Sequence, residues 1–507
     1  MSLSRIAVAL CAYAALFACP ATAQCPDGTP PPCAAQRALA PPPNSVAVLT
    51  FENTTRDTSA QYLAEGLADQ VFTRLGSVAR LTMVSRTAVR RLPHLDQLSV
   101  QQIGRALNVA YLVSGSIRAA GGRVRVNAEA LRAATGEAVW SSAFDRAADD
   151  LVGLEETIAT EVAAGVTGRL SPQERRALGG RVTASSAAYA QFLRGNVLMA
   201  RRSVASLRGA IGAYRAATTT DSGFADAYAR LGYGYALCAN WACGDRDSLL
   251  ADSRLATARA LRLDPRSSDG WMGRAYAQAV WAFTTEEAGV GDSLLASRAD
   301  DSLLASLPAF RRAVELNPRN DEAWHQYGST LIYVNDSAGL NALRQALALD
   351  PGRAITYAGG LSVVYGWMGR PDLALKAVDS AFALEPDGNF HGFRVNARLA
   401  VGDTAGALED ARAYSYTDIL AAFAHDSGSI RQMESEVAQP QLCGQYAQYL
   451  VWTGRREEAV RQLLLCRPSL ITRSVLRSPG LAALADDPRI RALRAACDSI
   501  LARVRWR

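Results

Sequence analysis

The chain of 507 residues is poor in the side chains on which many active sites depend. It has four histidines, too few to predict a metal site built from imidazole ligands. Lysine occurs once, at Lys376, and the net charge of +6 is small for this length and forms no dense basic block. No two cysteines have the C-x-x-C spacing of a redox site or zinc ribbon. We therefore expect no cofactor, no metal and no nucleic-acid partner.

Apolar runs long enough to span a bilayer are also missing, but a shorter one stands at the start. It covers residues 6–18, follows Arg5, and precedes an A-x-A cleavage site at Ala21–Ala23. This order predicts a secretory signal peptide over residues 1–23, and therefore a protein exported across the inner membrane to the periplasm or the outer membrane. The alternatives are an uncleaved anchor and a lipid tether at Cys19, which follows a sequence that resembles a bacterial lipobox.

Export to an oxidising compartment changes how the cysteines are interpreted, because it permits disulfides. Connectivity does not follow from sequence alone, and several buried thiols are the alternative. Neighbouring cysteines in the sequence suggest three disulfide pairs, Cys25–Cys33, Cys238–Cys243 and Cys443–Cys466, with Cys497 left over.

Residues 24–44 are rich in proline, which predicts an extended tether.

Residues 45–170 alternate between strand and helix signals, which predicts a compact α+β domain. An apolar run at 46–51 indicates a buried strand, and four-residue apolar spacing from Leu63 to Leu75 indicates an amphipathic helix. Ser99 is typical of a helix N-cap. The remaining elements expected are strands at 81–85, 111–118, 123–132 and 138–144, with a hairpin turn at Gly121-Gly122, and helices at 99–107 and 154–170.

Several motifs in this domain resemble a bacterial family related to the amino-terminal domain of TolB. They are the runs 46–53 (VAVLTFEN), 63–67 (LAEGL), 84–87 (VSRT), 103–109 (IGRALNV) and 115–140. In that family the domain commonly precedes tetratricopeptide repeats and follows a kinase, a nucleotide cyclase or a DNA-binding module. Here a signal peptide stands in the place of that effector. The resemblance therefore implies the α+β fold but transfers no catalytic or DNA-binding function.

The rest of the chain repeats one pattern, a helix end followed by an acidic or amide residue and a proline. The closing prolines Pro265, Pro318, Pro351 and Pro386 lie 53, 33 and 35 residues apart, and an aromatic follows six residues after each of the first three. This resembles the tetratricopeptide repeat, with a period of about 34 residues. The longer interval holds two copies of the run DSLLAS, which predicts helix extension or, alternatively, a binding element. The expected layout is a linker at 171–186, repeats at 187–437, and degenerate repeat helices with a cap at 438–507.

The resemblance also implies where a partner binds, since the first helices of such arrays line a concave groove. For each side chain that we place in this groove, the alternative is that it lies on ordinary helix surface and contacts no partner. Counting from the aromatic positions selects Tyr233, Tyr276, His325, Ser329 and Ser362.

The leading hypothesis for function is a non-enzymatic exported scaffold. Its repeats bind partner proteins or peptides, and its α+β domain binds another partner or ligand. One alternative is an envelope hydrolase with a carboxylate site at Asp149, Asp150 and Glu155, although acidic residues at this place more often favour a helix start. Another is an effector-less relative of repeat-containing kinases and cyclases that acts as a sensor.

Overall fold

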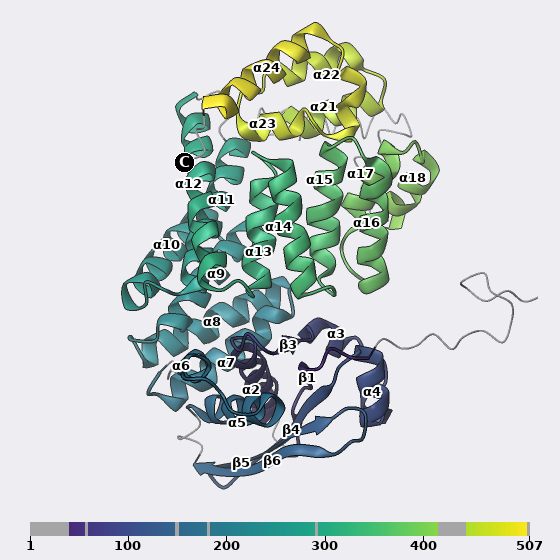
Figure 1. Ribbon diagram of the computed structural model, residues 1–507. Coiled ribbons are helices and arrows are strands. Elements are labelled where there is room, and N and C mark those ends of the chain that lie inside the picture. Colours follow the sequence, from purple (N-terminus) through teal and green to yellow (C-terminus); the bar gives the residue numbers. More distant parts are fainter. Residues whose placement is uncertain are drawn as a thin grey trace, which may run out of the picture. The chain divides into compact units, whose positions relative to one another are not determined.

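The computed structural model describes residues 40–55, 59–147, 152–179, 183–288, 293–413 and 443–503 (Figure 1). Its contacts divide the chain into two units, residues 1–43 and 44–507, and all elements named below belong to the second. The predicted signal peptide, with its alternatives, and the Cys25–Cys33 pair lie outside the described residues, as does most of the tether. No helix among the described residues is long and apolar enough to cross a bilayer.

A mixed β-sheet begins the second unit. Strand β1 runs parallel to β3 and β4, whereas β5 runs antiparallel to β4 and β6. Gly121 and Gly122 turn the predicted hairpin with φ of 59° and 73°, a region that suits glycine. The strands lie in the order β3 (Thr82–Met83), β1 (Ser45–Val48), β4 (Tyr111–Ala120), β5 (Arg123–Arg132) and β6 (Ala138–Ala147), and β2 (Glu52–Asn53) pairs with β4.

Helices cover both faces of this sheet. Helices α2 (Ser59–Leu75) and α5 (Leu154–Thr167) pack on the face to which alternate residues of β5 point, as the alternation predicted. On the opposite face, Ala47 and Leu112 contact α3 (Arg86–Arg90), the turn η1 (Leu95–Gln97) and α4 (Val100–Leu107). Ser99 caps α4 in a capping box with Gln102, which confirms the predicted helix start.

After the short helix α6 (Pro172–Leu178), the described chain continues as antiparallel helix pairs. The pair that contains the DSLLAS insert has the longest helices, of 21 and 24 residues, so helix extension is confirmed. The pairs are α7 (Ser186–Ala200) with α8 (Val204–Thr220), α9 (Ala225–Asn240) with α10 (Arg246–Leu263), α11 (Ser268–Ala288) with α12 (Ser293–Leu316), α13 (Asp321–Leu331) with α14 (Asp336–Leu349), the π-helix η2 (Thr356–Ser362) continued by α15 (Val363–Trp367) with α16 (Pro371–Leu384), and α17 (His391–Ala400) with α18 (Thr404–Ala413).

The six-residue spacing between proline and aromatic has a direct structural cause. The indole N–H of Trp271 donates to the carbonyl of Pro265 at 2.9 Å, and Trp324 donates to Pro318 at the same distance. Each bond fixes the turn between one pair and the next. Within a pair, Gly328 allows α13 to approach α14, because a Cβ at this position would lie 2.8 Å from a side-chain atom of Leu343.

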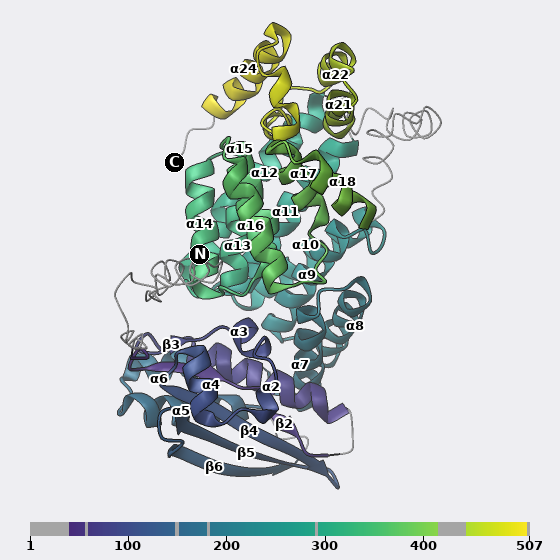
Figure 2. The ribbon, with the colours of Figure 1, turned by 90° about the vertical axis from the view of Figure 1, so that its right-hand side faces the viewer.

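The last described elements cap the array and return to earlier helices. They form a separate apolar cluster that contains Leu481 and Cys497. The Leu470 N–H donates to Asp300 Oδ1 at 2.9 Å, which connects this cap to α12, and Arg477 pairs with Asp336 at the start of α14. The cap comprises α21 (Cys443–Trp452), α22 (Arg456–Leu463), α23 (Leu470–Val475), the turn η4 (Pro479–Leu484) and α24 (Pro488–Arg503), seen in Figure 2.

Two of the cysteine predictions fall on described residues. Cys238 and Cys243 form the predicted disulfide across the turn between α9 and α10. Cys466 is also disulfide-bonded, while the side chain of its expected partner Cys443 lies outside the described set.

The sheet and the helical array are in contact within this unit. Gly66 on α2 lies so close to α7 that an added Cβ would be 2.7 Å from Leu193 Cβ. Arg319, in the turn after α12, donates to the Leu81 carbonyl at 2.9 Å. These contacts join segments more than a hundred residues apart, and no local sequence pattern predicts them.

Candidate functional site

The side chains that were expected to line an open groove are mostly buried. Tyr233 is 0% exposed, and Tyr276, His325 and Ser362 are also buried. Ser329 is half-buried, and its hydroxyl oxygen is buried without a hydrogen-bond partner among the described residues. The first helices α9, α11 and α13 pack side by side, so the side chains on this inner face contact one another. Four of the five side chains are therefore closed to a partner in this structure, and Ser329 is partly exposed.

A polar cluster closes this inner face and includes three of the five predicted residues. The Tyr233 hydroxyl donates to Glu322 Oε1 and accepts from Gln326 Nε2 at 3.0 Å. Glu322, in the first turn of α13, also pairs with Arg202 and, at 2.9 Å, with Arg353. The Tyr276 ring packs against the Tyr233 ring with centroids 5.4 Å apart. The cluster joins four separate helix pairs and the turn after α14.

The charges of this cluster compensate one another. Burial on its own raises the pKa of Glu322, but Arg202 and Arg353 outweigh burial and hold that pKa well below its usual value. Arg353 also pairs with Asp321, so both arginines face carboxylates. Burial, and then Arg353, lowers the pKa of His325 to about 3, and this neutral ring is 3.0 Å from the Thr356 hydroxyl.

The backbone of Arg202 adopts an uncommon conformation within this cluster. Arg202 follows the end of α7 and has φ of 50°, a left-handed conformation that costs a non-glycine residue about 1 kcal/mol. That conformation places its guanidinium on Glu322, 120 positions along the chain. With every charge paired, the cluster fixes the helices and leaves little for a ligand to bind.

Sequence reasoning missed the charged members of this cluster, although a signal for them exists. An acidic residue stands two positions before the aromatic in three successive first helices: Asp226, Asp269 and Glu322. Asp269 pairs with Arg230 at 2.9 Å. Burial, and then Asp269, raises the pKa of Asp226 to about 6. The acidic position is thus used for contacts between helix pairs.

Of the three carboxylates proposed for a hydrolase, Glu155 falls on the part of the chain that the structure describes. Asp149 and Asp150 lie outside the described residues. Glu155 is 0% exposed in the first turn of α5 and pairs with Arg74 of α2 at 2.9 Å. A buried carboxylate held by an arginine cannot reach a substrate in water. Among the described residues, no three histidine, cysteine or acidic side chains are grouped as a metal ion requires.

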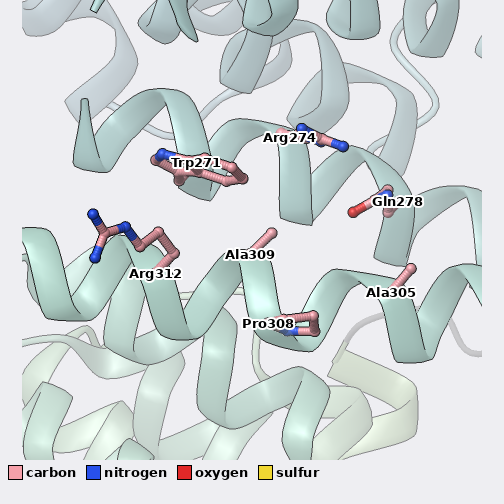
Figure 3. A pocket seen from close by; sticks show the side chains of 7 residues that line it. All are labelled: Trp271, Arg274, Gln278, Ala305, Pro308, Ala309 and Arg312. Carbon is pink, nitrogen blue, oxygen red and sulfur yellow. The ribbon is translucent and has the colours of Figure 1, made fainter. Parts of the chain in front are cut away.

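An accessible cavity of about 290 Å³ lies between α11 and α12 (Figure 3). Trp271, Arg274 and Gln278 line it from α11, at positions i, i+3 and i+7 of one helix face. The α12 wall consists of small or cyclic apolar residues and Arg312. The Arg274 guanidinium lies 5.5 Å from the centre of the Trp271 ring. We call this cavity the Trp271 pocket.

Comparisons with known proteins match parts of the chain. No protein-family model matches it. A protein of Rhizobium meliloti (strain 1021) named "Putative adenylate cyclase 3" is 28% identical over 152 residues, which are 29% of this chain and 26% of that protein. The chain thus spans about a quarter of the length of this curated relative.

Two solved structures each match part of the chain. A thermophilic tetratricopeptide-repeat protein of Thermus thermophilus is 20% identical, covers 44% of this chain and 99% of its own, and has a TM-score of 0.34. TolB of Acinetobacter baumannii is 18% identical, covers 25% of this chain and 29% of its own, and has a TM-score of 0.20.

Proposed function

We propose that this chain is a non-enzymatic scaffold that binds partner proteins through its tetratricopeptide-like helical array. The observation that carries this proposal is the array itself, in which successive helix pairs repeat the same proline-to-tryptophan bond. Stacked pairs of this kind present an extended surface, and binding there requires no catalytic group. Because the inner face is closed by paired charges, we place the binding surface on the accessible side of the pairs.

The α+β part is proposed to be a TolB-like module, with boundaries near 45 and 170, that binds a second partner or ligand. The supporting features are the sequence motifs between 46 and 140 and the mixed sheet covered by helices on both faces.

We also propose export with removal of residues 1–23. The mass of the mature amino terminus tests this, since it distinguishes a start at Gln24 from a lipidated Cys19, and an intact Met1 in the cytosol contradicts both.

Affinity capture tests the scaffold proposal. The mature chain, immobilised through its carboxyl end, is incubated with envelope extract of the source organism, and bound proteins are identified by mass spectrometry. The matched bait is the same chain unfolded by heat before immobilisation. A scaffold retains a reproducible set of proteins that the unfolded bait does not. Equal recovery on both baits, or turnover of a substrate by the purified chain, contradicts the proposal.

A further inference from the structure

The Trp271 pocket exists because one helix pair departs from its neighbours. In the flanking first helices, the residues three and seven positions after the aromatic are large, apolar and buried. At the equivalent positions α11 has Arg274 and Gln278. Polar side chains there do not fill the space between the two helices, and a cavity remains. The flanking residues are Leu231 and Tyr235 on α9 and Tyr327 and Leu331 on α13.

The two arginines of this pocket are exposed, and its polar groups have few partners among the described residues. Arg274 forms no ion pair with any described residue, and its one recorded contact is with the Trp271 ring. Arg312 has a single exposed pair with Glu315, at 3.5 Å, which is too weak to occupy its guanidinium. The Oε1 atom of Gln278 is buried and accepts no hydrogen bond from any described group. An unpaired buried acceptor costs about 1–3 kcal/mol, so stability alone does not account for glutamine here.

The apolar surface of the pocket is fixed in place. The Trp271 N–H is already bonded to the Pro265 carbonyl, so the orientation of the ring is set and its face is offered to the cavity. Opposite it, Pro308 and Ala309 of α12 present small apolar surfaces. A ligand that fits these groups combines an anionic group for an exposed arginine, a hydrogen-bond donor for Gln278, and an apolar group for the tryptophan.

We infer that the Trp271 pocket binds a short segment of a partner protein in which an acidic side chain adjoins an apolar one. The carboxylate pairs with Arg274, with Arg312 adding to the positive charge of the pocket, a backbone N–H of the segment donates to Gln278, and the apolar side chain packs on Trp271. A cavity of about 290 Å³ holds a residue or two, and not a long stretch of chain. This inference rests on the proposed scaffold function and names the site and the chemistry of its partner.

Selection from a display library of random heptapeptides on the full mature chain tests the inference. The expected result is enrichment of peptides in which Asp or Glu stands beside an aliphatic or aromatic residue. Fluorescence polarisation then compares an enriched peptide with its Gln or Asn counterpart, which is expected to bind at least ten-fold more weakly. Enrichment of peptides without an acidic residue, or of none, overturns the inference.

A charge-reversal variant and its control locate the binding. Arg274→Glu with Arg312→Glu reverses the charge of the pocket, and Arg254→Glu with Arg311→Glu makes the same change at exposed positions outside it. Only the change in the pocket is expected to abolish peptide binding.

A second pocket variant, Arg274→Tyr with Gln278→Leu, copies the next repeat and fills the cavity. It keeps the fold, as circular dichroism checks, and loses the peptide. Equal peptide binding by the wild type and either pocket variant overturns the inference, while capture of envelope proteins by the wild type still supports the scaffold.

Discussion

Replacing Glu322 by glutamine tests whether the inner-face cluster holds the helical array together. Glutamine keeps the size of the side chain and can still accept from Gln326 and bond to the Tyr233 hydroxyl. It removes the carboxylate that Arg202 and Arg353 share. Two cations then remain close together with one acidic partner, Asp321, on the Arg353 side. The variant therefore isolates the electrostatic part of the cluster from its packing.

The expected loss follows from the burial of the three side chains. The side chains of Glu322 and Arg353 are 10% and 15% exposed, so their pair counts as buried. Arg202 is 36% exposed, and solvent screens its share. Breaking a buried pair costs about 3–5 kcal/mol, and we expect a loss of about 3 kcal/mol because one of the two cations is screened.

The pH dependence of this loss has a defined sign. The pKa of Glu322 in the folded chain lies well below its unfolded value, so its stabilisation is fully present above the unfolded pKa of about 4.3. It disappears as the pH falls through the folded pKa. The difference between wild type and Glu322→Gln is therefore constant from pH 8 to pH 6 and shrinks below about pH 4.3.

Urea unfolding followed by circular dichroism, together with hydrogen exchange in α9 and α13, measures the loss locally as well as globally. Glu137→Gln is the matched control, since that carboxylate is 72% exposed and 4.0 Å from Arg132. A loss below about 1 kcal/mol, which is typical of a surface pair, or a difference that does not change with pH, refutes the reasoning.

Three further predictions concern packing, a buried carboxylate and the disulfide. Gly66→Ala is expected to lower the free energy of unfolding by about 1–3 kcal/mol because its Cβ meets Leu193, whereas Gly212→Ala, with nothing within 4 Å, is neutral or stabilising; urea unfolding compares the two. Burial raises the pKa of Asp300 to about 6, so its ionisation opposes folding above the unfolded pKa; Asp300→Asn should stabilise the chain at pH 8 and not at pH 4, which thermal melts at both pH values check. Cys238→Ser with Cys243→Ser should cost roughly 2 kcal/mol in urea unfolding, and an unchanged midpoint contradicts a structural role for that bridge.

Local signals in the sequence were enough to predict many elements of the fold, although β2 and α3 were missed and α6 lies in the stretch expected to be a linker. The alternation in β5, the Ser99 cap and the proline-to-aromatic spacing each depend on residues within a few positions of one another. The length of α12 also followed from a local duplication. Such features are specified by backbone geometry and nearby hydrogen bonds, so they are readable without the tertiary structure.

The state of the inner face was not predictable in the same way. Counting along one helix placed Tyr233 on the correct side, but its burial depends on how closely three first helices pack and on Arg202, which comes from an earlier pair. A consequence is that Tyr233→Glu with Tyr276→Glu, the natural test of an open groove, would bury two carboxylates and unfold the chain. Comparison of the repeats with one another, by contrast, does identify Arg274 and Gln278 as exceptions.

Hydrogen–deuterium exchange of the chain with a captured partner tests the central claim most directly. The account predicts slower exchange in residues 271–278 of α11 and 305–312 of α12, the two helices that line the Trp271 pocket. It predicts no change in α9 and α13, where the inner face is already closed. Slower exchange confined to α9 and α13, or no change anywhere in the helical array, contradicts it.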